Sequence, residues 1–257
     1  MNFYKEQIVP LLINMAMRQR NLAAYRTRVV PAAEDRVIEI GIGSGLNLPF
    51  YSRNVEHIIG LDPSPKLLLM ARRHPQPDAS PVKLVEGSAE AIPFGNASAD
   101  TVVTTWTLCS IFDVERALAE IRRVLKPGGR LLFVEHGRAP EPKVRWWQDR
   151  LTPVWKRLSG GCHLNRAINA LIEGAGFQLE RVETGYLLLG LYKRQTMPPS
   201  SAGWPKKFPN RSEALPFFNR DIVTAISHCP HVPRGLIPPS LNFSNVDVCQ
   251  CNLFVPF

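Results

Sequence analysis

Apolar residues recur three and four positions apart near the start of the chain, at Ile8, Leu11, Leu12, Met15, Leu22 and Tyr25. This period places them along one face of a helix, so the pattern predicts a single amphipathic helix within residues 1–30. Pro10 fits the first turn of such a helix, where its missing N–H leaves no hydrogen bond unmade. We therefore treat residues 1–30 as a unit of their own ahead of the main domain.

From residue 36 onward, short apolar and β-branched runs alternate with stretches of helical period. The runs predict strands over residues 36–40, 57–61, 82–85, 101–105, 130–134 and 177–182. The helical stretches predict helices that open at residues 46–51 and extend over residues 66–73, 114–125 and 164–175. Ser64 and Asp113 are the expected N-caps of two of these helices, and the Pro127-Gly128-Gly129 turn ends one of them.

Strands and helices that alternate at these intervals require parallel crossovers. The chain is therefore predicted to be an α/β protein with a Rossmann-like, doubly wound, mostly parallel sheet and flanking helices, followed by an irregular C-terminal extension. We place the sheet domain at residues 31–192 and the extension at residues 193–257. The extension is rich in proline, and its cysteines and histidines match no paired-ligand spacing, so we expect no metal site.

The length of 257 residues and the 45% hydrophobic content suit one domain with appendages. The longest apolar stretch has about ten residues, whereas crossing a bilayer takes roughly 20, so no spanning helix is predicted. Five cysteines in a chain of this size do not make a disulfide framework. A cytoplasmic location is therefore expected.

The net charge of +9 is concentrated in residues 3–28 and 138–157, and the second segment also holds Trp146, Trp147 and Trp155. These segments are either solvated faces or surfaces that touch an anionic membrane peripherally. Basic residues among aromatic ones also occur in nucleic-acid-binding proteins. Nothing else in the chain points to that class, so we expect no nucleic-acid partner.

Three glycines, Gly41, Gly43 and Gly45, directly follow the first predicted strand. Glycines let a ligand approach the backbone, and a helix that follows them directs N–H groups at it. A dinucleotide fingerprint would have its last glycine or an alanine at position 46, where this chain has Leu46, so a pyrophosphate-binding enzyme is disfavoured. Glu39 precedes the loop and is either an acceptor for a ligand ammonium group or a structural acid held by backbone amides.

Asp62 ends the second predicted strand, 21 residues after Gly41. An acid at this place can accept hydrogen bonds from both hydroxyl groups of a ribose. Asp-Pro-Ser is also a common turn. Together with Glu39 and the glycine loop, however, Asp62 completes a constellation for a nucleoside that carries an amino group.

On these residues the chain resembles the class I S-adenosylmethionine-dependent methyltransferases. The resemblance implies that S-adenosyl-L-methionine is the cofactor, with Glu39 near its amino-acid part and Asp62 near its ribose. It also implies that Ser88 and Ala89 lie beside the adenine and that Thr105 and Trp106 line the methionine pocket. Further cofactor-binding positions that it implies are Asn47, Pro63 and Gly87.

A narrower resemblance is to the methyltransferase-like proteins that include alkyl-thiol methyltransferases. It rests on Glu135-His136, on the tryptophan-rich segment that ends at Trp155, and on residues 160–166. It implies transfer of a methyl group to a small lipophilic acceptor, which could be a thiol, a lipid or another small molecule. Residues 1–30 and 138–158 flank the crevice in this topology, so we expect them to form an acceptor lid.

The acceptor of a methyl group has to lose its proton, and His136 at the end of the fifth predicted strand titrates in the right range. We expect His136 to act as a general base or to orient the acceptor, although it could also be a plain structural histidine. Cys109 is expected to be a small residue of the pocket wall. His163 is expected to belong to a helix start.

Two other functions compete with this hypothesis. One is a reductase that uses a nicotinamide cofactor on the same α/β layout. The position of the third glycine and the presence of Glu39 argue against it. The other is a non-catalytic protein that binds S-adenosylmethionine and docks on membranes through its basic segments.

Overall fold

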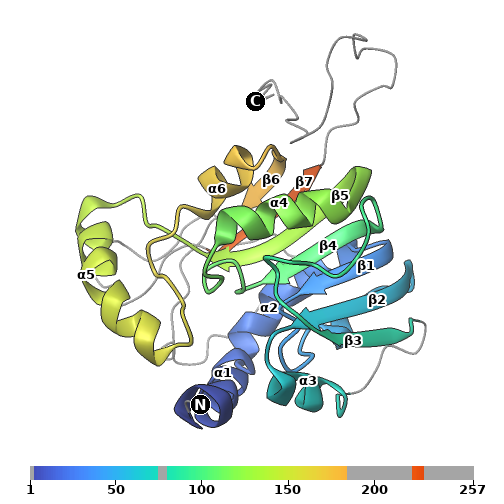
Figure 1. The fold of residues 1–257 in the computed structure, drawn as a ribbon. Coiled ribbons are helices and arrows are strands. Elements are labelled where there is room, and N and C mark those ends of the chain that lie inside the picture. The colour runs from blue at the N-terminus through green and yellow to red at the C-terminus, as the bar shows by residue number, and fades with distance from the viewer. Residues whose placement is uncertain (1–2, 75–79, 184–221, 229–257) are drawn as a thin grey trace, which may run out of the picture.

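The computed structural model describes residues 3–74, 80–183 and 222–228, and its centre is a seven-stranded sheet within these ranges (Figure 1). The strand order is β3-β2-β1-β4-β5-β7-β6, and β7 runs antiparallel to both of its neighbours. The strands are β1 (Asp35–Ile40), β2 (Val55–Asp62), β3 (Val82–Glu86), β4 (Ala99–Thr105), β5 (Leu125–His136), β6 (Gln178–Glu183) and β7 (Ile222–His228). The predicted mostly parallel, doubly wound sheet is confirmed.

Helices cover both faces of the sheet, which explains why its central strands read as continuous apolar runs. Along β5, Leu131 and Phe133 pack into the core under α4 (Val114–Val124) and α6 (Ile168–Gly174). Leu132 and Val134 alternate with them and pack into the opposite core, under α2 (Arg20–Val29) and α3 (Pro65–Ala71). Each inward side chain therefore finds a helix on its own side.

Two capping predictions are confirmed at the starts of α3 and α4. The Ser64 hydroxyl accepts a hydrogen bond from the Leu67 N–H at 3.4 Å, and Pro65 occupies the first helical position. The Asp113 carboxylate accepts one from the Arg116 N–H at 3.0 Å. Such caps satisfy N–H groups that have no partner within the helix.

The predicted single N-terminal helix is wrong, because the chain forms η1 (Tyr4–Ile8), α1 (Val9–Met17) and α2 instead. Gln19 breaks the helix with an extended backbone, φ −61° and ψ 138°. The two parts face different surroundings: α2 buries Leu22 and Val29, while α1 leaves Leu11 exposed. A continuous helix could not serve both, so the break follows from packing.

The helix expected to open at residues 46–51 is also wrong, since only the short η3 (Leu48–Phe50) forms there. Tyr51 returns to an extended backbone, and its hydroxyl is used to bind Glu39 inside the protein. The helix expected from residue 164 starts later, as α6. Before it, the His163 N–H donates to the Cys109 carbonyl at 2.9 Å, which holds this stretch against the end of β4.

Part of the extension at residues 193–257 is regular, contrary to the expected irregular structure. Residues 222–228 form β7, which pairs with β5 on one side and β6 on the other. Other residues of the extension lie outside the described ranges.

A 17-residue helix, α5 (Pro142–Leu158), stands to one side of the sheet (Figure 1). Tyr4 of η1 donates its hydroxyl hydrogen to the Leu158 carbonyl at 3.2 Å, so the start of the chain meets the end of α5. Neither α5 nor any other helix in the described ranges is both long and apolar enough to span a membrane.

Candidate functional site

The glycine loop follows β1 at the carboxyl end of the sheet, as predicted. Gly41, Gly43 and Gly45 all have positive φ angles, of 70°, 57° and 81°. A Cβ atom on Gly41 would lie 2.3 Å from the Thr107 Oγ1 atom, so a larger residue does not fit. A Cβ on Gly43 would meet only the Gly41 carbonyl oxygen at 3.9 Å. The loop is therefore packed at Gly41 and open to a ligand at Gly43.

Asp62 lies beside this loop, at the end of β2, and is only 5% exposed. One of its carboxylate oxygens accepts the Gly43 N–H at 2.9 Å, and the other accepts the Ser64 N–H at 2.8 Å. Burial raises the pKa of Asp62, and these two backbone hydrogen bonds oppose the rise. Each oxygen retains a second lone pair, which leaves capacity for the two hydroxyl groups of a ribose.

Glu39 precedes the loop, near the end of β1, and is 1% exposed. Its two carboxylate oxygens accept hydrogen bonds from the Asn47 side-chain amide at 2.8 Å and from the Tyr51 hydroxyl at 2.7 Å. Burial raises the pKa of Glu39 to about 7, against the lowering effect of these hydrogen bonds and of Arg26. The carboxyl group therefore titrates near pH 7, and a cationic ligand would stabilise its ionised form.

Arg26 of α2 completes the network, although its charge falls in a segment that the sequence predicts to be a surface. It is 4% exposed and donates from Nε to the Asn47 side-chain oxygen at 3.0 Å. Its guanidinium also lies over the Trp106 ring, 4.9 Å from the centroid. Burial lowers the pKa of Arg26 to about 10, and the nearby Glu39 opposes this change. Arg26 is therefore a buried partner of the site.

The segment predicted to lie beside adenine follows β3. The Gly87 N–H donates to the Asp62 carbonyl at 3.2 Å, which brings the segment next to Asp62. The Ser88 hydroxyl donates to the Glu90 carboxylate, and Ala89 is buried in the core beneath α4. Pro63 is exposed, so it forms an outer edge of this region.

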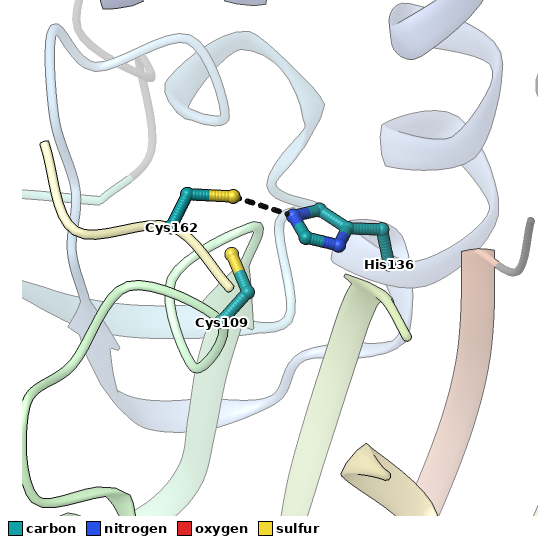
Figure 2. A group of neighbouring side chains, drawn as sticks. All are labelled: Cys109, His136 and Cys162. Atoms are coloured by element: carbon teal, nitrogen blue, oxygen red, sulfur yellow. Dashed lines mark hydrogen bonds between the residues drawn. The ribbon is translucent and has the colours of Figure 1, made fainter. Parts of the chain in front are cut away.

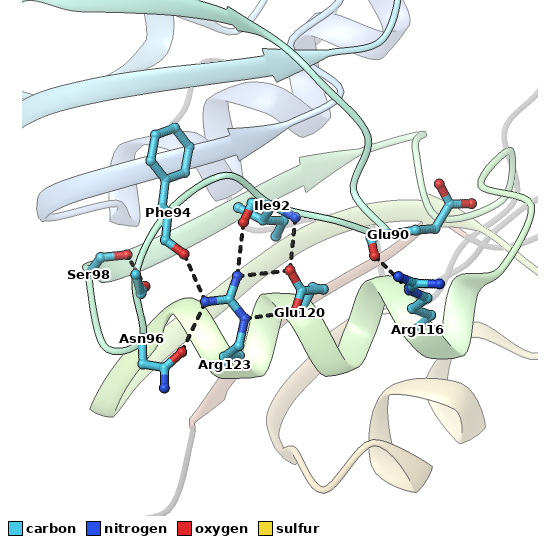
Figure 3. A network of polar contacts seen from close by, with 9 residues as sticks. Glu90, Ile92, Phe94, Asn96, Ser98, Arg116, Glu120 and Arg123 are labelled. Atoms are coloured by element: carbon cyan, nitrogen blue, oxygen red, sulfur yellow. Dashed lines mark hydrogen bonds and ion pairs between the residues drawn. The ribbon is translucent and has the colours of Figure 1, made fainter. Parts of the chain in front are cut away.

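Helix α4 fixes the chain that follows this segment (Figure 3). Arg123 donates to the carbonyl oxygens of Phe94 at 2.8 Å and of Ile92 at 2.9 Å, and it pairs with Glu120 at 2.7 Å. Arg116 donates to the Glu90 carbonyl at 2.9 Å. Charged donors satisfy loop carbonyls that no strand partner reaches, so the predicted adenine segment is held rigidly at its far end.

Thr105 ends β4 and Trp106 follows it, both close to the Glu39 network. The Thr105 hydroxyl accepts from the Asn47 amide at 3.0 Å, and Trp106 has a positive φ of 52° that turns the chain out of the strand. Of the predicted cofactor positions, the structure therefore joins Glu39, Asn47 and Thr105 through the Asn47 amide, and joins the glycine loop to Asp62.

Glu135 of β5 has a role that the sequence analysis missed. It is fully buried, and its carboxylate accepts the N–H groups of Thr107 at 2.7 Å, Leu108 at 2.8 Å and Cys109 at 3.3 Å. Burial raises its pKa, while these hydrogen bonds lower it. Glu135 thus anchors the loop after β4. The available signal was an acid in an otherwise apolar strand, as with Glu39 in β1.

His136 lies in a cluster with Cys109 and Cys162 (Figure 2), and the Cys109 thiol donates to the Trp106 carbonyl at 3.5 Å. Its Nε2 atom lies 2.9 Å from the Cys162 sulfur. Burial alone would lower the pKa of His136, but Cys162 and Glu135 together raise it above its usual value. Cys109, expected as a plain wall residue, is buried with its sulfur in this cluster. The His163 N–H donates to the Cys109 carbonyl and so helps to hold Cys109 in place.

A doubly wound sheet with an open glycine loop between two desolvated carboxylates defines a nucleoside-binding protein of the Rossmann-like class. The donor set fits S-adenosylmethionine, since Asp62 retains acceptors for a ribose and Glu39 can accept an ammonium group. A pyrophosphate would instead bring negative charge between two acids. The residues present therefore favour the sulfonium nucleoside.

Comparison with known proteins agrees with this class. The methyltransferase domain family matches residues 38–133. Thiol S-methyltransferase TMT1B of Rattus norvegicus is 36% identical over 157 residues, which cover 58% of this chain and 63% of the relative. Thiol S-methyltransferase TMT1A of Homo sapiens is 33% identical over 171 residues, covering 63% of this chain and 68% of the relative. The alignments thus span about two thirds of the length of these relatives.

Solved structures share the fold. The YcgJ protein of Bacillus subtilis has a TM-score of 0.58 at 18% identity, covering 83% of this chain and 99% of that one. An S-adenosylmethionine-dependent methyltransferase of Mesorhizobium loti has a TM-score of 0.54 at 15% identity, covering 82% and 98%. Taken with the sequence relatives, the chain belongs to the class I S-adenosylmethionine-dependent methyltransferases.

Proposed function

We propose that the protein is a methyltransferase that transfers the methyl group of S-adenosylmethionine to a small lipophilic thiol. The observation that carries the proposal is the pair of buried carboxylates next to an open glycine loop: Glu39 precedes the loop, and Asp62 binds its Gly43 N–H. The similarity to thiol S-methyltransferases over about two thirds of their length supports the choice of a thiol. It also favours methyl transfer over a nicotinamide-dependent reductase and over a non-catalytic membrane-docking protein.

The proposed cofactor site divides the ligand among three groups of residues. Glu39, oriented by Asn47 and Tyr51, accepts the ammonium group, and Asp62 accepts the ribose hydroxyls. Gly87, Ser88 and Ala89 lie beside the adenine. Bound S-adenosylmethionine supplies an electrophilic methyl group that the acceptor displaces in line. The protein needs no nucleophile of its own, because alignment in a dry site lowers much of the barrier.

The acceptor is proposed to bind at His136, at the carboxyl end of β5. A thiol has a pKa near about 8.5, so one positioned side chain is enough to favour its thiolate. His136 ends β5 and clusters with Cys109 and Cys162, and Cys109 contacts the Trp106 carbonyl at 3.5 Å, at the β4 end of the cofactor site. His136 orients the acceptor and favours loss of its proton.

Two elements are proposed to enclose the acceptor as a lid: α1 with η1, and α5. Asn14 of α1 accepts the Ser44 hydroxyl at 2.7 Å, so α1 already contacts the glycine loop. Val9 and Ile13 of α1 pack toward Gly160, just after α5. Several of their apolar side chains are exposed: Ile8, Leu11, Leu12, Met15, Trp146 and Trp155.

The surface formed by these exposed side chains is also proposed to touch a membrane peripherally from the cytoplasm. A lipophilic acceptor could then enter the site from the membrane.

A direct assay tests the function. Purified full chain is incubated with methyl-labelled S-adenosylmethionine and a panel of alkyl thiols, amines, phenols and lipids, and labelled products are identified. We expect a labelled thioether, and we expect His136→Gln to lower turnover at least about tenfold with cofactor affinity retained. His57→Gln, at an exposed position of β2, is the matched control. Absence of any affinity for S-adenosylmethionine or its demethylated product would refute the proposal.

A further inference from the structure

Three side chains of metal-binding type, far apart in the sequence, meet beyond the carboxyl ends of β4 and β5. Cys109, His136 and Cys162 each direct one donor atom toward the others, and these atoms all lie within 4.8 Å of one another (Figure 2). We propose that these residues bind one Zn²⁺ ion and leave its fourth coordination position open to an exogenous ligand. This revises the expectation of no metal site, which rested on spacing along the chain.

The donor set and its dimensions suit zinc. Two thiolates and one imidazole favour zinc over magnesium or calcium, which take oxygen ligands. Zinc–sulfur bonds of about 2.3 Å and zinc–nitrogen bonds of about 2.1 Å keep tetrahedral donors roughly 3.5–3.8 Å apart. The Nε2 atom of His136 and the sulfur of Cys162 are 2.9 Å apart, so zinc binding requires them to separate by about 0.7 Å.

The backbone holds all three ligands in place before any ion binds. Cys109 is fixed at its N–H by Glu135 and at its carbonyl by the His163 N–H. His136 ends β5. The Gly160-Gly161 pair before Cys162 has φ angles of 72° and 105°, and a Cβ atom on Gly161 would lie 3.1 Å from the Ser110 carbonyl oxygen. The glycines therefore let Cys162 approach the loop after β4.

The surroundings also suit a zinc thiolate site. The Trp155 indole N–H donates to the Cys162 sulfur at 3.4 Å, as a group stabilising a thiolate would. Arg166 donates to the Leu108 carbonyl and interacts electrostatically with both cysteines. Outer contacts of this kind orient metal ligands and tune their affinity. His136 has no hydrogen bond at Nδ1 within the described ranges, so the cluster alone orients its ring through Nε2.

We infer that the open coordination position binds the acceptor thiol. This role rests on the proposed function. Zinc sites with three protein ligands take a fourth ligand from outside, and a thiol that coordinates there is deprotonated. The acceptor thiol would give its proton to solvent and keep its electron pair on sulfur. That sulfur forms the new bond to the methyl carbon, and the electrons of the broken methyl–sulfonium bond stay on the departing thioether. His136 would then orient the acceptor through the ion.

The experiment measures metal binding without relying on turnover. The full chain is reduced, stripped of metal, and titrated with Zn²⁺ against a chromophoric chelator, with elemental analysis for stoichiometry. We expect one zinc per chain, and Cys109→Ser, Cys162→Ser and His136→Gln should each weaken binding about a hundredfold. Co²⁺ in place of zinc should give a thiolate charge-transfer band in the full chain that both cysteine variants diminish.

Two controls separate this site from zinc bound by other thiols and from loss of folding. The Cys249→Ser/Cys251→Ser variant removes thiols of the extension and should bind zinc like the parent chain. Thermal unfolding with and without zinc should show stabilisation of the parent chain but not of the cluster variants, which also reports whether those variants fold. Substoichiometric zinc, equal affinity in Cys109→Ser, or loss only in the extension variant would overturn the site.

The two proposals fail in different ways. Stoichiometric zinc without thiol turnover would leave the metal site standing and remove the proposed function. Thiol turnover that persists in the stripped protein would keep the function and remove the role of zinc in it. A Cys109–Cys162 disulfide in protein purified without reductant, with no zinc uptake after reduction, would replace the metal site by a redox pair.

Discussion

The buried carboxyl group of Glu39 affects both the stability of the fold and the affinity of the site for a cation. Its carboxyl group is buried, and its pKa of about 7 in the folded protein compares with an ordinary value of 4.5. The folded chain therefore holds a proton that the unfolded chain has released. The contribution of Glu39 to the stability of the cofactor-free protein is complete below about pH 4.5 and is lost as the pH rises through about 7.

The same proton should couple to cofactor binding. An ammonium group favours the ionised carboxylate, so affinity for S-adenosylmethionine should rise from about pH 6 to about pH 8, with proton release on binding. Glu39→Gln should lower affinity about a hundredfold and abolish this dependence, because a buried charge pair is lost. Calorimetry in buffers of different ionisation enthalpy measures both effects. Glu56→Gln, exposed on β2, is the control, and an unchanged pH dependence in Glu39→Gln would contradict the assignment.

For individual residues, the sequence identified the two acids of the site but not the side chains that bind or neighbour Glu39. Glu39 and Asp62 were predictable because each stands at a fixed place relative to a strand end and the glycines. Arg26 and Tyr51 were not predictable from the sequence. They lie 13 residues before and 12 residues after Glu39, and only the folded chain brings their side chains to it. Nothing local distinguishes Arg26 from the solvent-exposed Arg28 two positions later.

At the scale of elements, α1 separates two functions that one long helix could not combine. The break at Gln19 lets α2 enter the core while α1 keeps an apolar face uncovered beside the glycine loop. The expected strands and caps formed because apolar runs and capping residues act locally. The other two helix predictions that differ from the structure, at residues 46–51 and before α6, lie where side chains or backbone groups make hydrogen bonds to the site instead of within a helix.

Removal of η1 and most of α1 tests the lid. Deletion of residues 1–16 spares the Met17 carbonyl that accepts from Arg26, so the core contact is kept. We expect KM for a lipophilic thiol to rise about tenfold, the effect of losing about one buried apolar side chain. The Kd for S-adenosylmethionine should change little. Leu69→Ala, an exposed leucine on α3, is the control, and an unaltered KM in the deletion would refute the lid.

For the molecule as a whole, the surface most suited to membrane contact is the one that carries exposed apolar and basic residues of α5. The chain carries a net charge of +9, and α5 combines the exposed Trp155 with exposed basic residues such as Lys156 and Arg157. Such a combination suits an anionic lipid surface better than water alone. The fold itself was largely predictable at this scale, because alternating strands and helices leave few topologies.

Membrane contact is tested by flotation with vesicles. The full chain should bind vesicles that contain phosphatidylserine and should bind neutral phosphatidylcholine vesicles weakly. Binding should fall about tenfold between about 0.05 M and 0.5 M salt, because charge attraction is screened over a few ångströms at high ionic strength. Leu11→Ser/Leu12→Ser should reduce binding further, whereas Leu69→Ser should not. Equal binding to both vesicle types would exclude the electrostatic contribution.

The position of β7 has a consequence for biosynthesis. Within the described part of the sheet, β6 is hydrogen-bonded to β7 alone, yet β7 follows it by 38 intervening residues. During synthesis β6 is complete before β7 has been made, so at that point β6 has no strand neighbour within the described part of the sheet. These two of the seven strands can therefore join the sheet only once residue 228 is available, and chains interrupted earlier would present an unpaired strand to the cell's quality-control machinery.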